Sequence, residues 1–166
     1  MAIGQRLGLP GTDIEALKIG GILHDIGKVA IPLEILGKPG PLTDEEREII
    51  KGHSVIGYNI CLPLKRTLGQ ALVAIRSHHE KLDGSGYPDG MKGDEISMVA
   101  KIMAVADIYD ALITDRPYRK ALNKDLALKI LNDESKMGRL DKNVVAALEE
   151  TLRREVVILQ KRAYVA

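Results

Sequence analysis

The chain has 166 residues, a length typical of one domain built around a continuous hydrophobic core. Hydrophobic residues make up 45% of it but aromatic residues only 3%, with no Trp and no Phe, so the core must be aliphatic, which favours packed helices over a β-sandwich. The net charge of +1 comes from mixed charges along the chain. This argues against binding to duplex nucleic acid or to a membrane surface, but it leaves room for a small anionic ligand.

Cys61 is the only cysteine, which excludes a disulfide within the chain. A lone cysteine in an apolar helical segment typically packs in a core and suits a reducing compartment. No apolar run approaches the roughly 18 residues of a membrane span, and the N-terminus lacks the apolar region of a signal peptide. These features predict a cytoplasmic protein with no membrane contact.

Residues 1–9 have the pattern of a helix end, so we expect that the natural protein either continues upstream or is shortened here. Thr12 and Glu15 form a capping-box pattern, which predicts a helix that runs from there to His24. Residues 29–42 hold three prolines and two glycines, which predicts an irregular connector. A second capping box, at Thr43 and Glu46, opens a helix in which His53 is predicted to lie within an apolar stripe of Ile49, Ile56 and Ile60.

A further helix is predicted from about Leu68 to His79. Residues 80–97 contain four glycines and a proline, which excludes helix and strand and predicts a long loop of the kind that is usually functional. Three more helices follow: one from about Met98 to Ile113, one from Asn123 or Asp125 to about Asn132, and a last one capped by Asp141. No segment alternates as a strand would, so the predicted fold class is all-α.

Each of the four histidines stands beside, or at helical spacing from, another candidate metal ligand. With the aspartate beside His24 and another in an apolar helix, they make six imidazole and carboxylate groups on four predicted helices: His24, Asp25, His53, His78, His79 and Asp107. Such groups suit Fe, Mn, Zn or Ni, and a carboxylate can bridge two ions. Two ions about 3.5–4 Å apart can clamp the attacking and leaving oxygens of a phosphodiester.

Each of these residues also has a purely structural interpretation. His24 and Lys28 could stabilise a helix end capped by Gly27. His78 and His79 could likewise stabilise the C-terminal end of their own helix, and His53 could be a hydrogen-bonded core histidine. A carboxylate in an apolar helix, such as Asp107, must be paired or metal-bound. Asp110 is better explained by capping or by pairing with an arginine. The cations Lys28, Arg116 and Arg119 would ordinarily be surface charges, but as a set they could hold phosphate oxygens.

These motifs together resemble an HD-GYP domain, from about Leu7 to Ala147: His24-Asp25-Ile-Gly-Lys28, His53, His78-His79-Glu80, Asp83-Gly-Ser-Gly-Tyr87-Pro88, Asp107-Ile-Tyr-Asp110 and Arg116-Pro-Tyr-Arg119. The resemblance implies an HD-domain helical bundle with a long irregular GYP loop. It also implies a metal-dependent phosphodiesterase that hydrolyses cyclic di-GMP, or the related cyclic GMP-AMP, to pGpG and in some members on to GMP. A metal-bridged hydroxide would be the nucleophile, and two divalent ions, Fe or Mn with Ni or Zn as alternatives, would be the cofactors.

By position, the resemblance assigns metal ligation to all six imidazole and carboxylate residues named above, with Asp25 as the bridging ligand. Asp25 and Lys28 would be catalytic, and Lys28, Tyr87, Arg116 and Arg119 would contact the substrate. The GYP loop implies a GGDEF-domain protein as a partner.

The sequence departs from the family pattern in two places. Family members usually carry a further histidine, sometimes with a glutamate, on an upstream helix, so residues 1–166 are expected to form an N-terminally shortened HD-GYP-like domain without that helix or a sensor or receiver domain. Lys101 stands where the pattern usually has arginine. These departures motivate an alternative, a weakly active or inactive module that binds a nucleotide or a protein.

Two further alternatives concern substrate and assembly. An HD phosphohydrolase for other nucleotides, such as alarmones, is a third interpretation, against which the Gly-Tyr87-Pro88 loop argues. The stripe along the last helix (Val145, Leu148, Leu152, Val156 and Leu159) could pair two copies of the chain as a homodimer or pack on its own domain.

Overall fold

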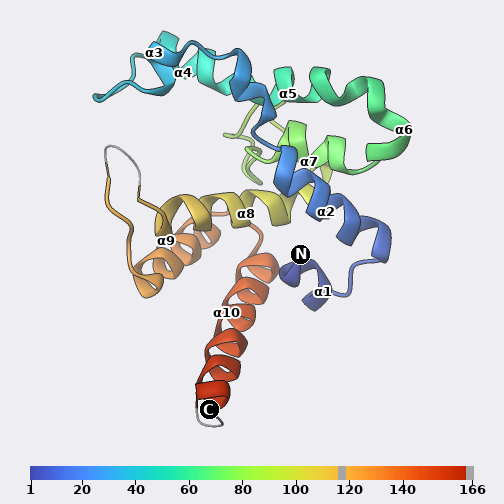
Figure 1. Cartoon of the computed structure of the whole chain (residues 1–166), viewed down its shortest axis with the longest axis vertical. Helices are drawn as coiled ribbons and strands as arrows, with labels where there is room; N and C mark the ends of the chain where they lie inside the picture. The colour runs from blue at the N-terminus through green and yellow to red at the C-terminus, as the bar shows by residue number, and fades with distance from the viewer. Residues whose placement is uncertain (116–118, 164–166) are drawn as a thin grey trace.

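The computed structural model describes residues 1–115 and 119–163, with side chains described up to residue 154. All regular elements of this part of the chain are helical, and an antiparallel bridge joins Asp83 to Lys92. The predicted all-α fold is therefore confirmed (Figure 1). The elements are α1 Ala2–Arg6, α2 Gly11–Leu23, η1 Ile26–Ala30, α3 Leu33–Leu36, α4 Asp44–Lys51, α5 His53–Cys61, η2 Leu62–Leu64, α6 Lys65–Leu68, α7 Ala71–Ser77, η3 Gly93–Glu95, α8 Met98–Ile113, α9 Lys124–Lys136 and α10 Lys142–Ala163.

Helix α8 is the centre of the core. It runs across the middle of the molecule and contacts α2 and α7 as well as α9 and α10 (Figure 1). Ser97 caps its N-terminus by accepting a hydrogen bond from the backbone N–H of Ala100. Because aliphatic residues occur on nearly all sides of this helix, it can be buried between the other helices, and Ile102 and Val105 have almost no exposed surface.

Close backbone packing holds the N-terminal segments against this core. Gly20 of α2 faces α7, where an added Cβ would lie 2.7 Å from the Cβ of Ala74. Gly27 of η1 lies against the start of α5, where an added Cβ would lie only 1.9 Å from the carbonyl oxygen of His53. Glycine is therefore required where the His24–Lys28 segment meets α5.

Two sequence predictions about helix starts had different outcomes. Thr43 and Glu46 form the predicted capping box, with both reciprocal hydrogen bonds present. The prediction at Thr12 is wrong: α2 begins one residue earlier, and its N-cap residue is Pro10, which has no side-chain hydrogen bond. Proline there fixes an extended conformation before the helix, which leaves the Thr12 hydroxyl outside the capping position.

The predicted apolar stripe around His53 is also wrong. The segment divides at Gly52 into α4 and α5, and His53 is the first residue of α5. Ile49 and Ile60 are 44% and 47% exposed, whereas the buried face of α5 consists of His53, Ser54, Gly57 and Cys61. Small residues occupy this face because η1 packs directly against it.

The C-terminal helices begin as predicted. Asn123 caps α9 through the backbone N–H of Leu126, and the Asp141 carboxylate accepts from two backbone N–H groups in the first turn of α10. Val145 and Leu148 of α10 are buried against the same domain, and α10 contacts α1, α8 and α9. The side chains of Val156 and Leu159 lie outside the described part. None of the described helices is both long and apolar enough to cross a bilayer.

Candidate metal centre

His24 and Asp25 lie where α2 ends and η1 begins. His24 is the C-cap residue of α2, and its Nδ1 lies 2.9 Å from the carbonyl oxygen of Gly21. Because a carbonyl oxygen only accepts, Nδ1 carries the hydrogen and Nε2 faces the site. The next residue, Asp25, is the N-cap residue of η1, and the change of backbone direction there lets both neighbouring side chains reach one place.

His53 enters from the first turn of α5 and is 1% exposed. Its Nδ1 lies 2.7 Å from the carbonyl oxygen of Ile50, so its Nε2 also faces the site, 3.4 Å from Oδ1 of Asp25.

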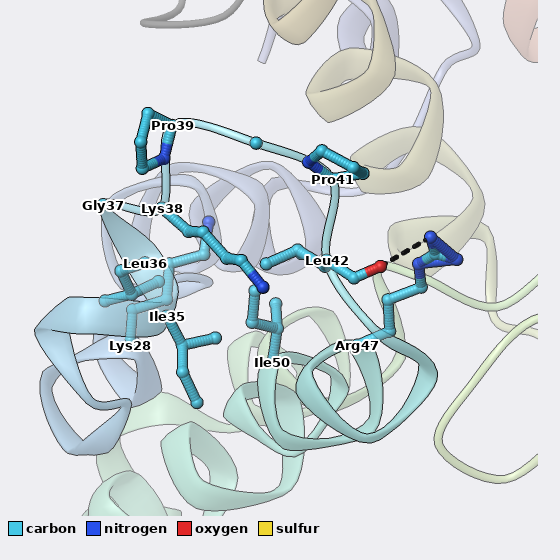
Figure 2. A pocket seen from close by; sticks show the side chains of 11 residues that line it. Lys28, Ile35, Leu36, Gly37, Lys38, Pro39, Pro41, Leu42, Arg47 and Ile50 are labelled. Carbon is cyan, nitrogen blue, oxygen red and sulfur yellow. Dashed lines mark hydrogen bonds between the residues drawn. The ribbon is translucent and has the colours of Figure 1, made fainter.

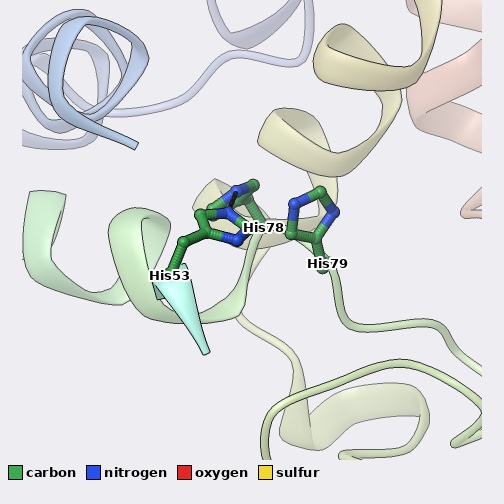
Figure 3. Close-up of side chains that lie close together, drawn as sticks. All are labelled: His53, His78 and His79. Carbon is green, nitrogen blue, oxygen red and sulfur yellow. Dashed lines mark hydrogen bonds between the residues drawn. The ribbon is translucent and has the colours of Figure 1, made fainter. Parts of the chain in front are cut away.

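His78 and His79 follow the last turn of α7. The Nδ1 of His78 donates to the carbonyl oxygen of Ile75 at 2.9 Å, and its Nε2 lies 3.3 Å from the Nε2 of His53 (Figure 3). One ring nitrogen from each of His53, His78 and His79 lies within 4.8 Å of the other two. The close-up shows these three rings gathered between α5, α7 and the start of the loop that follows.

Asp107 of α8 closes the arrangement from the opposite segment of the core. Its Oδ1 lies 3.7 Å from the Nε2 of His24, and its Oδ2 lies 3.9 Å from the Nδ1 of His79. Asp25 is placed in the same way, because Oδ1 faces His53 and Oδ2 lies 3.4 Å from the Nε2 of His24. Each carboxylate therefore spans two imidazoles, and the six residues form a ring of contacts.

The hydrogen-bond pattern fits metal ions. The nearest groups to the Nδ1 atoms of His24, His53 and His78 are backbone carbonyls, an arrangement that commonly orients histidine ligands so that Nε2 meets a metal. If His53 and His78 are both neutral, their facing Nε2 atoms each present a lone pair and neither can donate to the other. A cation between them would satisfy both nitrogens.

The pKa values of the histidines agree with this interpretation. Burial lowers the pKa of His53, and burial together with neighbouring imidazoles lowers the pKa of His78 to about 4 and that of His79 to about 3. These three imidazoles are therefore neutral at pH 7, the form that binds a metal. His24 differs, because hydrogen bonds to Asp107 and Asp25 raise its pKa to about 10. In the metal-free protein its proton supplies positive charge between the two carboxylates, and a metal ion would replace it.

The two carboxylates are ionised despite partial burial. Burial raises the pKa of Asp25, but His24 and Lys28 lower it more, and the balance leaves the pKa below its ordinary value. The same opposition at Asp107, with His24 as the strongest opposing partner, also leaves its pKa lowered. The site thus concentrates two negative charges beside four imidazoles, a donor set that suits divalent transition metals.

The structure places the residues expected to contact substrate at different distances from this ring. Lys28 lies beside it, with Nζ 2.6 Å from Oδ2 of Asp25. Tyr87 stacks on His79, with ring centroids 4.6 Å apart. Arg119 donates to the carbonyl oxygens of Ala111 and Leu112 at the end of α8, which is a structural role. Arg116 lies outside the described residues.

Two residues to which the sequence analysis assigns no role position the GYP loop. Glu80 is 3% exposed and accepts hydrogen bonds from the backbone N–H groups of Asp89 (2.7 Å) and Met91 (3.0 Å). Arg76 forms a bidentate pair with the Asp89 side chain, at 2.8 and 2.7 Å. Both contacts tie the loop to the end of α7, next to His78 and His79. Glu80 could have been suspected, because an acid following two candidate ligands rarely stays unpaired when buried.

Lys101, which replaces the usual arginine, is nearly buried. Its Nζ lies 3.7 Å from Asp94 and 3.8 Å from Asp141, so it bridges the loop and the start of α10. These contacts give Lys101 a role in holding the loop against α10.

Comparisons with known proteins agree with the helical fold. The chain is 44% identical over 149 residues to the cyclic di-GMP phosphodiesterase response regulator RpfG of Xanthomonas campestris, covering 88% of this chain and 39% of that protein. It is 40% identical over 152 residues to the 3′3′-cGAMP-specific phosphodiesterase 3 of Vibrio cholerae, covering 90% and 32%. The chain therefore spans well under half the length of these relatives.

A solved structure shows the same fold. Bd1817, an HDG"Y"P protein of Bdellovibrio bacteriovorus, superposes with a TM-score of 0.73 at 24% identity, covering 92% of this chain and 48% of that one. This likeness and the names of the relatives confirm the resemblance to HD-GYP domains. The sequence profile of the HD domain matches residues 1–144, most of the chain. The chain therefore belongs to the HD domain family.

Proposed function

We propose that this domain is a metal-dependent phosphodiesterase that hydrolyses cyclic di-GMP or a related cyclic dinucleotide. The observation that carries the proposal is the ring of four imidazoles and two carboxylates, in which three ring nitrogens lie within 4.8 Å of one another and each carboxylate spans two imidazoles. The relatives support the substrate class, since those compared here are named as cyclic di-GMP or 3′3′-cGAMP phosphodiesterases.

The proposed cofactors are two divalent cations, Fe or Mn, with Ni or Zn as alternatives, held by the six residues of the ring. When bound, such a pair lowers the pKa of an attacking water and stabilises charge on the phosphate oxygens. Asp25 is the proposed shared ligand, because its two oxygens face different imidazoles.

Other residues of the chain would bind and orient the substrate. Lys28 places an ammonium group beside Asp25, where it can neutralise a phosphate oxygen. Tyr87 covers His79 and would limit access of water to the scissile bond. Arg116 and Arg119 remain candidates for phosphate contacts, although Arg119 would first have to release the end of α8. The products would be pGpG and, after a second cleavage, GMP.

The test is turnover of cyclic di-GMP by the purified chain with Mn(II) or Fe(II) under reducing conditions, followed by chromatography together with metal analysis. We expect linear pGpG to form. Asp25→Asn should abolish turnover and weaken metal binding, because one carboxylate oxygen and the negative charge of the shared ligand are lost. Asp110→Asn is the matched control, since Asp110 is exposed one turn beyond Asp107 on α8.

Two outcomes would reject the proposal. One is a metal-loaded protein with no hydrolysis, and the other is an Asp25→Asn variant with the full rate. Binding of cyclic di-GMP without product would instead select the inactive binding module, and hydrolysis of alarmones in its place would select the third interpretation.

The proposal extends to partners and location. Residues 80–97 carry exposed side chains such as Asp83, Ser85 and Asp89 and would form the contact with a GGDEF-domain protein. Since the proposed substrate is an intracellular messenger, the protein would act in the cytoplasm. A homodimer that forms through α10 would use the second half of this helix, because the first half packs on its own domain.

A further inference from the structure

A cavity of about 660 Å³ opens beside the metal-binding ring, between the connector of residues 37–42 and helices α3 and α4. Figure 2 shows the connector arching over the side chains of Ile35, Leu36 and Ile50, with the Leu42 carbonyl oxygen fixed by a 2.8 Å hydrogen bond from Arg47. Lys28 lines the cavity and also contacts Asp25. Lys28 therefore belongs both to the wall of the cavity and to the edge of the candidate catalytic centre.

The lining combines apolar surface with positive charge. Aliphatic side chains (Ile35, Leu36, Leu42 and Ile50) and the rings of Pro39 and Pro41 form its apolar part. Lys28, Lys38 and Arg47 supply cations, and among the described residues no carboxylate lines the cavity. Lys38 forms an ion pair with Glu46, and Arg47 forms one with Asp44.

This combination suits a purine nucleoside attached to a phosphate. The flat, weakly polar faces of a purine pack well on aliphatic and proline surfaces, whereas the phosphate needs a cation where the cavity meets the metal site. The volume falls within the range of about 300–1,000 Å³ that is typical of small-molecule sites.

A second cavity lies on another side of the ring, so each of the two cavities could hold one of the two nucleosides of a cyclic dinucleotide. It has a volume of about 500 Å³ and meets the ring at His78 and His79, next to Tyr87. Helix α4 contributes to both, with Ile50 lining the first cavity and Lys51 lining the second. A cyclic dinucleotide carries one nucleoside on each side of the scissile phosphate, so it needs two such spaces beside one metal centre.

We propose that the cavity under the 37–42 connector binds one purine nucleoside of the cyclic dinucleotide, while Lys28 contacts the adjoining phosphate. This inference rests on the proposed function and adds where the substrate lies. It makes Leu42 and Ile50, which both line the cavity, determinants of substrate affinity.

The kinetic test fills the cavity with a larger side chain. Leu42→Trp should raise the KM for cyclic di-GMP by about tenfold or more relative to Leu33→Trp, because Leu33 is 81% exposed on neighbouring α3 and does not line the cavity. The small diester bis(p-nitrophenyl) phosphate carries no nucleoside, so its kcat/KM should be unchanged in Leu42→Trp. The ratio of kcat/KM for cyclic di-GMP to kcat/KM for this diester should therefore fall by the factor by which the KM for cyclic di-GMP rises. Ile50→Ala, compared with the exposed neighbour Ile49→Ala, is a second variant that shortens a wall of the cavity and should raise the same KM.

A binding measurement separates this inference from the proposed activity. In methyl NMR spectra of the metal-free protein, added cyclic di-GMP should shift the signals of Ile35, Leu42 and Ile50 and leave that of Ile22, 81% exposed on α2, unchanged. Shifts at these methyl groups in a protein that hydrolyses neither diester would uphold the cavity and reject the activity. Unshifted cavity methyls, or equal KM values for Leu42→Trp and Leu33→Trp in an active enzyme, would overturn the inference.

Discussion

Gly27 connects the fold to the site, and its replacement by alanine should damage both. A methyl group at this position would lie 1.9 Å from the carbonyl oxygen of His53 and 2.6 Å from the backbone nitrogen of Gly57. Real Cβ atoms essentially never come closer than 3.0 Å to another atom, and both opposing atoms belong to the backbone. The segments η1 and α5 would therefore have to separate by about 1 Å, since neither atom can rotate away.

This movement should cost stability and metal affinity together. Overpacking of this kind costs about 1–3 kcal/mol, and a displacement of about 1 Å at a catalytic constellation can cost about a hundredfold in rate. The displacement would separate His53 from Asp25, which are 3.4 Å apart. We therefore expect Gly27→Ala to lower the free energy of unfolding, weaken Mn(II) binding and reduce turnover.

The assay is urea unfolding of the metal-free protein combined with Mn(II) titration. Gly21→Ala is the control, because a Cβ at this position in α2 meets nothing within 4 Å and should add about 0.5–1 kcal/mol of stability. If Gly27→Ala kept the stability and Mn(II) affinity of the Gly21→Ala protein, the reasoning about close packing between η1 and α5 would be refuted.

Three further predictions concern protons and the loop. The pKa of His24 is raised to about 10 in the metal-free protein, so a metal must displace its proton. As the pH is raised toward that value, the affinity for Mn(II) should increase about tenfold per pH unit, and calorimetry in two buffers should detect proton release. A pH-independent affinity would contradict this. Glu80→Gln turns an amide NH₂ toward one of the two backbone N–H donors, so it should cost about 1–3 kcal/mol of unfolding free energy and speed hydrogen exchange at Asp89 and Met91. Glu95→Gln, at an exposed position of the same loop, should have little effect. Equal exchange rates in both variants would contradict the role of Glu80 in holding the loop. Thr43→Ala should cost about 1 kcal/mol of unfolding free energy and Thr12→Ala much less, since only Thr43 caps a helix; equal losses would be inconsistent with the two helix starts.

Composition and helical spacing were sufficient to predict the fold class and the bounds of α8. Asp107 could be singled out in that helix because a carboxylate among aliphatic residues needs a partner, and the structure provides His24 and His79. The convergence of the six residues could be inferred only through the family resemblance. Their distances depend on contacts far apart in the sequence, such as Gly27 against His53.

The incorrect or missing predictions arise where residues or contacts outside a local sequence pattern decide the structure. Thr12 matches the capping pattern, but Pro10 sets the helix start, and the pattern alone does not distinguish the two. The stripe around His53 assumed one continuous helix, whereas the break at Gly52 changes which face is buried. Glu80 and Arg76 act on a loop whose path is set by tertiary contacts, so local sequence gives little indication of their roles.

Anomalous diffraction from crystals of the chain soaked in Mn(II) tests the central claim most directly. The account predicts two anomalous peaks about 3.5–4 Å apart within the ring of imidazoles and carboxylates, with Asp25 contacting both. A single peak elsewhere on the protein, or none inside the ring in a crystal that contains Mn(II), would contradict it.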